Sequence, residues 1–305
     1  MKVIKGVKKR PRKVLLYGTH GIGKTSWAAQ AGNVIVLDTE GGGGDVGCDR
    51  TPVLRDLGSV NAWLSDLAMQ PHDYRWVAVD TLDWLERLMF KAVCESKGKT
   101  NIDDIGYAKG REFALTHWDF VLRSLEHLMV SRNMGVILLA HARIVKIEEP
   151  ELDSYNKYEP DLDKRSCGLL QEWCDEVFFA RYRVNTVSKD MGFNRERIRV
   201  VGQAGDRLVY TCEGPGYFAK RRIAIPDSIP LDFSAYLACI KQAYSAAMPL
   251  MEQPAVAASS SNGETTTEQP TADQLADGTT PAAGNVAGLI NNGSSKDPSP
   301  EWATT

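Results

Sequence analysis

The amino-acid sequence contains no hydrophobic run that approaches the roughly 20 residues needed to span a membrane. Its first 13 residues hold seven lysines or arginines but neither an apolar core nor a small-residue cleavage site, which excludes a secretory signal peptide there. The six cysteines form no C-x-x-C pair and no Cys/His group at zinc spacing. We therefore expect a cytoplasmic protein with reduced thiols and no membrane partner.

Composition divides the 305 residues into three segments. A basic N-terminal arm covers residues 1–13, and a domain with regular apolar runs covers residues 14–248. Residues 249–305 are mostly small or polar, with seven acidic side chains against one lysine, which predicts a disordered acidic tail of net charge −6. Since the whole chain has net charge −3, about +3 remains on the rest. The tail is either a solvating linker or a segment that recruits a partner protein.

Strand-like and helix-like segments alternate along the central domain, which predicts an α/β fold with a mostly parallel, doubly wound sheet. The expected strands are 14–17, 34–37, 76–79, 136–140 and 176–180, and the expected helices are 60–69, 82–95 and 113–132. Beyond Gly192 we expect an antiparallel extension, with strands at 195–202, 207–212 and 223–225, a turn at 203–206 and a terminal helix at 233–246. Such sheets bind ligands at the carboxyl ends of their parallel strands.

A phosphate-binding motif follows the first expected strand. The pattern G-x-x-x-x-G-K-[ST] is matched at every fixed position by Gly18-Thr19-His20-Gly21-Ile22-Gly23-Lys24-Thr25, and Ser26 continues into a helical run. The glycines let backbone N–H groups turn toward phosphate, Lys24 can reach the β- and γ-phosphate oxygens, and the Thr25 hydroxyl can ligate Mg²⁺. The motif predicts a bound nucleoside triphosphate. ATP is favoured over GTP because no N-K-x-D motif is present to read guanine.

Acidic side chains end the second and third expected strands. Glu40 precedes four glycines and is our candidate for the general base that deprotonates the attacking water; the alternative is that it only opens a turn. Asp80 ends the third strand, where it can accept a hydrogen bond from Thr25 or from a Mg²⁺-bound water. Asp83 is interpreted as a cap or first-turn residue of the next helix.

A histidine ends the fourth expected strand. A polar side chain at this position lies near the γ-phosphate, so His141 is a candidate sensor of that phosphate. The alternative is a buried histidine that serves only the structure.

The order of these motifs resembles that of the RecA-type ATPases. The matching segments are the phosphate loop, Asp38-Thr39-Glu40, Trp76-Val77-Ala78-Val79-Asp80 and Leu138-Leu139-Ala140-His141-Ala142-Arg143, with further support from 107–113, Trp118-Asp119 and 219–223. Over about residues 12–240 the chain is most similar to the phage-encoded nucleotide-binding proteins of that superfamily, which include single-strand annealing recombinases. The resemblance implies that Lys24 and Thr25 bind ATP and Mg²⁺, that Glu40 is catalytic and that Asp80 lies on the metal side. His141 stands where recombinases usually carry Gln, so sensing is expected to vary with pH.

Two basic residues, Lys220 and Arg222, resemble those that reach the neighbouring subunit's ATP in RecA-type filaments. The resemblance implies a homo-oligomer in which this pair stabilises the transition state in trans. The alternative is a solvated basic turn at a strand edge.

The same resemblance, together with two basic stretches, predicts binding of single-stranded DNA. The N-terminal arm is one stretch, and the other contains Lys97, Lys99, Tyr107, Lys109 and Arg111. The segment 146–165, which in recombinases contacts DNA, carries four basic and seven acidic residues here and is expected to be an acidic loop that binds phosphate poorly.

Two functions remain open from the sequence. The first is a DNA-stimulated ATPase that assists single-strand annealing or strand exchange in phage recombination, placed in the host cytoplasm if the gene is phage-encoded. The second is an ATP-switched assembly or loading factor that acts on a protein partner without binding DNA directly. In either case the tail is a candidate contact for a single-strand binding protein or another replication or recombination protein.

Overall fold

The computed structural model describes residues 9–106, 109–148, 153–190 and 196–247. The predicted acidic tail and most of the predicted basic arm lie outside these ranges, so both remain predictions. Within the described ranges, no helix is long and apolar enough to cross a lipid bilayer.

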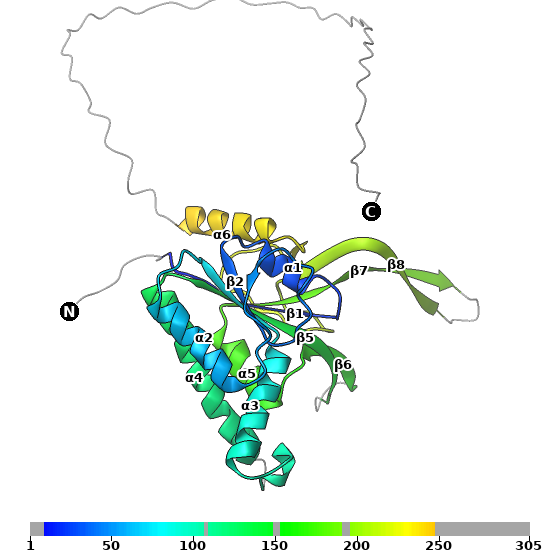
Figure 1. Cartoon of the computed structure of the whole chain (residues 1–305). Coiled ribbons are helices and arrows are strands. Elements are labelled where there is room, and N and C mark those ends of the chain that lie inside the picture. Colours follow the sequence, from blue (N-terminus) through cyan, green and yellow to red (C-terminus); the bar gives the residue numbers. More distant parts are fainter. Residues whose placement is uncertain (1–8, 107–108, 149–152, 191–195, 248–305) are drawn as a thin grey trace, which may run out of the picture. The chain divides into compact units, whose positions relative to one another are not determined.

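A single sheet of nine strands organises the described residues (Figure 1). Its strand order is β3-β2-β4-β5-β1-β7-β8-β9, and β6 pairs with β5 outside this path. The strands are β1 (Lys13–Gly18), β2 (Val34–Asp38), β3 (Asp49–Arg50), β4 (Trp76–Asp80), β5 (Gly135–Ile147), β6 (Tyr155–Pro160), β7 (Glu176–Asp190), β8 (Glu196–Tyr210) and β9 (Ser228–Pro230). Pairing is parallel from β3 to β7 and antiparallel for β7-β8, β8-β9 and β5-β6.

Strand β1 shows why the central strands are apolar along their whole length. Leu15 and Tyr17 are fully buried in the core cluster on one face of the sheet, and Val14 and Leu16 are fully buried in the cluster on the other face. A strand covered on both faces cannot alternate apolar and polar residues, because successive side chains point to opposite faces.

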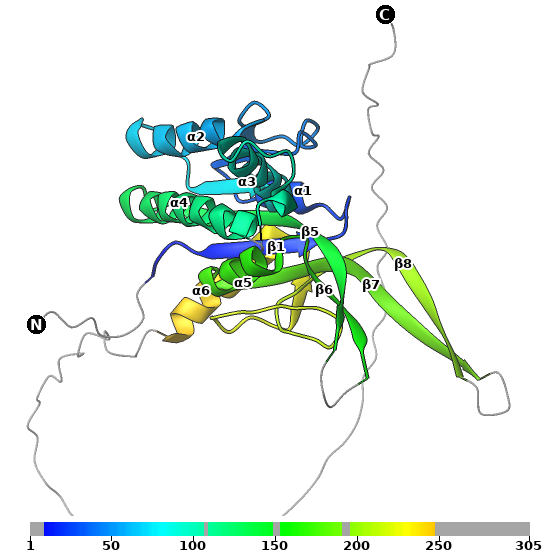
Figure 2. The ribbon, with the colours of Figure 1, turned by 90° about the horizontal axis from the view of Figure 1, so that it is seen from below.

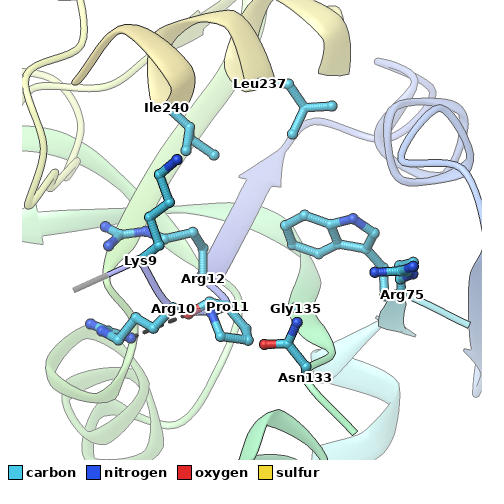
Figure 3. Close-up of a pocket in the computed structure, with 10 residues that line it drawn as sticks. Lys9, Arg10, Pro11, Arg12, Arg75, Asn133, Gly135, Leu237 and Ile240 are labelled. Atoms are coloured by element: carbon cyan, nitrogen blue, oxygen red, sulfur yellow. Dashed lines mark hydrogen bonds between the residues drawn. The ribbon is translucent and has the colours of Figure 1, made fainter. Parts of the chain in front are cut away.

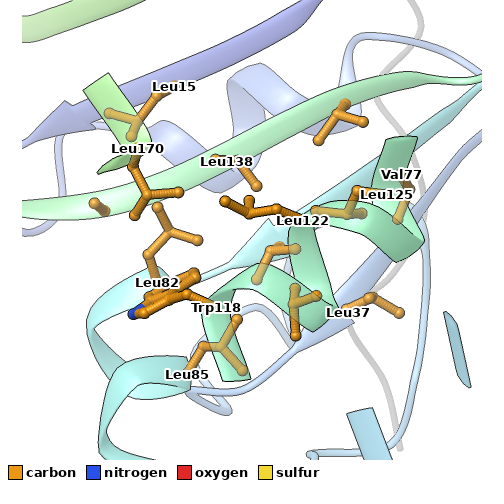
Figure 4. Packing of buried hydrophobic residues seen from close by; sticks show 14 of the residues in the cluster. Leu15, Leu37, Val77, Leu82, Leu85, Trp118, Leu122, Leu125, Leu138 and Leu170 are labelled. Carbon is orange, nitrogen blue, oxygen red and sulfur yellow. The ribbon is translucent and has the colours of Figure 1, made fainter. Parts of the chain in front are cut away.

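Helices cover both faces of the sheet (Figures 1 and 2). The first face carries α2 (Leu57–Met69), α3 (Leu82–Ser96), α4 (Lys109–Ser131) and α5 (Lys164–Trp173), and the second carries α1 (Lys24–Ala29) and α6 (Phe233–Ala247). A short 3-10 helix, η1 (Ile102–Asp104), precedes α4. In the first cluster the fully buried Trp118 of α4 lies beside Leu82 and Leu85 of α3 (Figure 4). The predicted α/β fold, with a mostly parallel sheet and antiparallel C-terminal strands, is confirmed.

The predicted turn at 203–206 is wrong. Strand β8 runs through these residues and pairs antiparallel with β7, with Asp190 opposite Glu196 at one end of the ladder. The ladder is irregular at residues 203–206, since Tyr182 pairs with Arg207 whereas Val184 pairs with Gly202. The turn-forming residue types therefore mark a bulge in a continuous strand rather than a reversal.

Two further expectations are corrected. The segment 223–225 is not a strand, and β9 occupies the expected third position of the antiparallel extension. The described part of the segment 146–165 is not one loop, because β5 continues to Ile147, β6 pairs with it, and α5 begins at Lys164; residues 149–152 lie outside the described residues. Most of β6 is only partly buried and its sequence contains no apolar run, which is why the sequence pattern did not predict a strand there.

Candidate nucleotide-binding site

The carboxyl ends of the parallel strands bring most of the predicted site residues to one cavity. The strand register places Gly18 beside His141 and Asp38 beside Asp80. The cavity has a volume of about 300 Å³ and is lined by His20, Lys24, Thr25, Glu40, Asp80 and His141, among others. Four separate segments of the sequence therefore meet where the α/β fold was expected to bind its ligand.

The phosphate loop depends on its glycines. Gly21 and Gly23 have φ values of 70° and 106°, a region that favours glycine. A Cβ atom on Gly18 would lie 2.4 Å from the carbonyl oxygen of Ala180, so β1 approaches β7 this closely only with glycine there. Ile22 is fully buried in the second core cluster and anchors the loop.

Lys24 is buried within this loop. Its Nζ donates hydrogen bonds to the carbonyl oxygens of Gly18, at 3.2 Å, and Thr19, at 3.1 Å. Burial lowers the pKa of Lys24, although the charges of Asp80 and Glu40 act in the opposite direction. The ammonium group is thus held at the loop, with two nearby carboxylates that favour its charged form.

The predicted metal-side pair is in contact. The Thr25 hydroxyl donates a hydrogen bond to Asp80 Oδ2 at 2.7 Å. Burial raises the pKa of Asp80 to about 6; the hydrogen bond from Thr25 opposes this, and the charges of Glu40 and Asp38 add to it. A hydroxyl beside a carboxylate is the set of hard oxygen donors that suits Mg²⁺. Helix α1 begins after Gly23 without a side-chain cap, so a phosphate can accept hydrogen bonds from its first backbone N–H groups. The glycine loop and these oxygen donors together fit a triphosphate and its Mg²⁺.

His141 is buried and tied to Asp83. Its Nδ1 lies 3.0 Å from Asp83 Oδ2, and its backbone N–H donates to Asp83 Oδ1 at 3.1 Å. Burial alone would raise the pKa of Asp83, but the hydrogen bonds from His141 outweigh it and lower the pKa. An ionised carboxylate only accepts hydrogen bonds, so Nδ1 carries a proton. Asp83 does lie in the first turn of α3 as predicted, but it also orients the histidine.

The second nitrogen of His141 points toward the candidate base. Its Nε2 lies 3.9 Å from Glu40 Oε1. Since Nδ1 carries the proton of the neutral ring, Nε2 is then an acceptor and cannot donate to a phosphate as glutamine does. Only the doubly protonated ring has a free donor. The predicted dependence of sensing on pH therefore remains a prediction with a defined chemical origin.

Two further contacts at this site were not predicted from the sequence. The ring of His20 stacks on that of His141, with centroids 3.7 Å apart and planes inclined by 18°. Arg207 of β8 donates a hydrogen bond to the Ile22 carbonyl oxygen at 3.2 Å and so braces the loop from outside. Both contacts join segments that are distant in sequence. His20 occupies a variable position of the motif and Arg207 lies within a strand, so no local pattern marks either residue.

Lys220 and Arg222 are not at this cavity. Lys220 pairs with Val177 near the start of β7, and Arg222 NH1 lies 3.5 Å from Asp175. These contacts lie at the amino ends of the parallel strands, whereas the phosphate loop lies at their carboxyl ends. Any role of the pair in ATP binding therefore requires the site of another subunit, and this prediction is untested.

The amino ends of the strands carry a second cavity, of about 410 Å³ (Figure 3). Lys9, Arg10, Arg12 and Arg75 line it together with the apolar side chains of α6. Two of these cations are already paired, because Arg10 hydrogen-bonds Asp175 and Arg12 hydrogen-bonds Glu176.

Arg111, which was predicted to contact DNA, is also paired within the chain, as are three basic residues of the segment that was expected to bind phosphate poorly. Arg111 contacts Asp163, with Nε 3.0 Å from Oδ2, as well as Asp103. In the segment 146–165, ion pairs join Lys146 to Glu148, Lys157 to Glu213 and Arg165 to Glu112. Tyr107 lies outside the described residues.

Fold and site together define a P-loop NTPase domain. A family model described as an AAA domain matches residues 10–223, more than half of the chain, so the chain belongs to that family. A comparison with curated proteins gives no match. Among solved structures, the crystal structure of the RadB recombinase is similar at 13% sequence identity and a TM-score of 0.39, over 66% of this chain and 80% of that one.

Proposed function

We propose that the protein hydrolyses ATP with the help of Mg²⁺. The observation that carries the proposal is the 2.7 Å contact of Thr25 with Asp80 beside Lys24, in one cavity with Glu40 and His141. Mg²⁺ would supply positive charge that offsets the charge redistributed on the phosphates. Thr25 and Asp80 would hold the metal side, and Lys24 would bind the β- and γ-phosphate oxygens.

In this proposal, Glu40 orients and deprotonates the attacking water. Its carboxylate follows β2 at the cavity and faces His141 rather than a fixed cation. A water between Glu40 and His141 Nε2 would donate to both acceptors, which leaves its oxygen lone pair free for attack.

We extend the proposal to an oligomeric, DNA-stimulated ATPase that assists single-strand annealing or strand exchange. The support is the resemblance of the motifs to the phage recombinases and the basic residues Lys97, Lys99 and Lys109, of which Lys97 lies over the Phe113 ring. Lys220 and Arg222 would complete a neighbouring subunit's site.

An ATP-switched assembly or loading factor is the second candidate. It is favoured by the ion pairs of Arg111, Lys146, Lys157 and Arg165, since a cation already paired with a carboxylate gains less from a DNA phosphate.

One pair of measurements tests both candidates. ATP turnover is measured with and without single-stranded DNA, and binding to a labelled oligonucleotide is measured at two salt concentrations. A DNA-stimulated ATPase shows higher turnover with DNA and a steep loss of binding as salt rises. Turnover without any DNA effect supports the switch, and absence of ATP turnover contradicts both.

A further inference from the structure

We propose that His20, Glu40 and His141 form a binding site for a transition-metal dication of the Zn²⁺ class, separate from the Mg²⁺ position at Thr25 and Asp80. One ligand atom from each of the three residues lies within 4.8 Å of the other two. Two imidazoles and one carboxylate are a donor set that suits Zn²⁺, whereas Mg²⁺ prefers oxygen alone.

The relation between His141 and Glu40 supports this site. With Nδ1–H donated to Asp83, the Nε2 lone pair of His141 faces Glu40 Oε1 across 3.9 Å, which is too long for a direct hydrogen bond. In the neutral ring with this tautomer, a cation or a water placed between the two acceptors would satisfy both. Tetrahedral bonds of about 2.0–2.2 Å would place the two ligand atoms roughly 3.4 Å apart, so a shift of about half an ångström from the present distance closes the site on one ion.

Asp83 supplies what metal-binding histidines generally have. A carboxylate that accepts the other ring N–H fixes the tautomer and the orientation of the imidazole and raises its basicity. His141 thus reaches the cavity as a preoriented ligand from a buried position, with 5% of its surface exposed.

His20 provides the adjustable third ligand. It is exposed, and its ring stacks on that of His141. A rotation of this exposed side chain out of the stack would turn its ring nitrogen toward the other two donors. Three protein ligands then leave a fourth position open.

The site would compete with hydrolysis. This consequence rests on the proposed function, because an ion held by Glu40 removes the candidate base and occupies the space between it and His141. Zn²⁺ is therefore expected to inhibit ATP turnover, whereas Mg²⁺ supports it.

Metal binding is tested directly on the full-length, nucleotide-free protein with Co²⁺ as a spectroscopic substitute for Zn²⁺. We expect one equivalent to bind with d–d absorption bands and no thiolate charge-transfer band. His20→Asn should weaken binding at least tenfold, and Glu40→Gln, an independent variant, should weaken it as well. The control His127→Asn changes an exposed histidine of α4 outside the group and should bind like the unaltered protein.

The proposal is overturned if no metal binds, if a thiolate band shows cysteine ligation, or if both variants bind Co²⁺ normally. Turnover of ATP with Mg²⁺ in a zinc-selective chelator is measured separately. If the protein hydrolyses ATP but binds no Co²⁺, only the proposed metal site is contradicted. If it binds Co²⁺ but does not hydrolyse ATP, only the proposed ATPase activity is contradicted.

Discussion

Two buried aspartates, Asp175 at the amino ends of the parallel strands (the amino edge) and Asp80 at their carboxyl ends (the carboxyl edge), have opposite electrostatic surroundings. At the amino edge, Asp175 accepts hydrogen bonds from Arg10 at 2.8 and 2.5 Å and from the backbone N–H of Lys13 at 3.2 Å. At the carboxyl edge, Asp80 has the Thr25 hydroxyl at 2.7 Å, and the neighbouring charges of Glu40 and Asp38 repel it.

The pKa directions express this difference between two aspartates. Burial acts to raise the pKa of Asp175, but Arg10 and Arg12 outweigh it and the pKa falls. Burial raises the pKa of Asp80 to about 6, and two other carboxylates add to the rise. Asp175 is therefore neutralised within the chain, whereas Lys24 and Thr25 do not outweigh burial at Asp80, so its ionised form would gain from a bound cation, which is a property expected of a ligand site.

The largest expected effect comes from removing the cation of the carboxyl edge. Lys24→Ala should reduce ATP turnover by about 10²-fold or more, because the charge nearest the transferring phosphate is lost. Turnover is measured with Mg²⁺ and saturating ATP. Lys91→Ala, at an exposed i,i+4 pair of α3, is the matched control and should retain turnover. Normal turnover in Lys24→Ala would contradict the ATPase assignment.

A second change separates chemistry from binding at the same edge. Glu40→Gln keeps the shape of the side chain but removes its basicity, so hydrolysis should fall by about 10²-fold while ATP still binds. Single-turnover hydrolysis and equilibrium nucleotide binding are measured side by side. If hydrolysis persists, Asp80, Asp83 or a group from another subunit must orient the water.

The contrast between the edges also explains what could be predicted from the sequence. Lys24, Thr25 and Asp80 belong to local motifs that follow strands, and the topology of a parallel sheet brings strand ends together. The pairing of Asp83 with His141 and the stack of His20 are distant in sequence, and they depend on side-chain rotamers that no local pattern encodes. The ion pairs of the amino edge were missed because Arg10 and Arg12 were interpreted as a basic arm.

A third change asks whether the amino edge serves a second subunit. Lys220→Ala/Arg222→Ala should fold and bind ATP yet hydrolyse it about tenfold more slowly, because the missing charge is needed mainly in the transition state. Mixed with Lys24→Ala protein, it should regain part of its turnover through composite sites.

The mixture is informative only when mixed oligomers form, which cross-linking of differently tagged chains establishes. No recovery in such oligomers would mean that the pair acts within its own subunit or in folding. Lys220 already bonds the carbonyl oxygens of Gln171 and Glu172, so a measurement of unfolding accompanies the test.

The smallest effect is expected from breaking the neutralised edge itself. Asp175→Asn removes the charge that Arg10 and Arg222 face. We expect the free energy of unfolding to fall by about 1 kcal/mol at pH 7. The loss is limited because Arg10 is partly exposed and asparagine still accepts a hydrogen bond. ATP turnover should remain unchanged. Asp119→Asn, in an exposed pair with Arg123, is the matched control and should cost only a few tenths of a kcal/mol.

The sign of the pH dependence follows from the lowered pKa of Asp175. Near pH 4 the unfolded chain binds more protons at this carboxyl than the folded protein does, so the stabilisation is present above the ordinary value of 3.8 and is lost as the pH falls through the folded pKa. Urea unfolding at about pH 7, 5 and 3.5 should therefore show the difference between the unaltered protein and Asp175→Asn constant at the two higher values and smaller at the lowest. A difference that grows on acidification would mean that Asp175 is destabilising when ionised, and that the amino edge resembles the carboxyl edge after all.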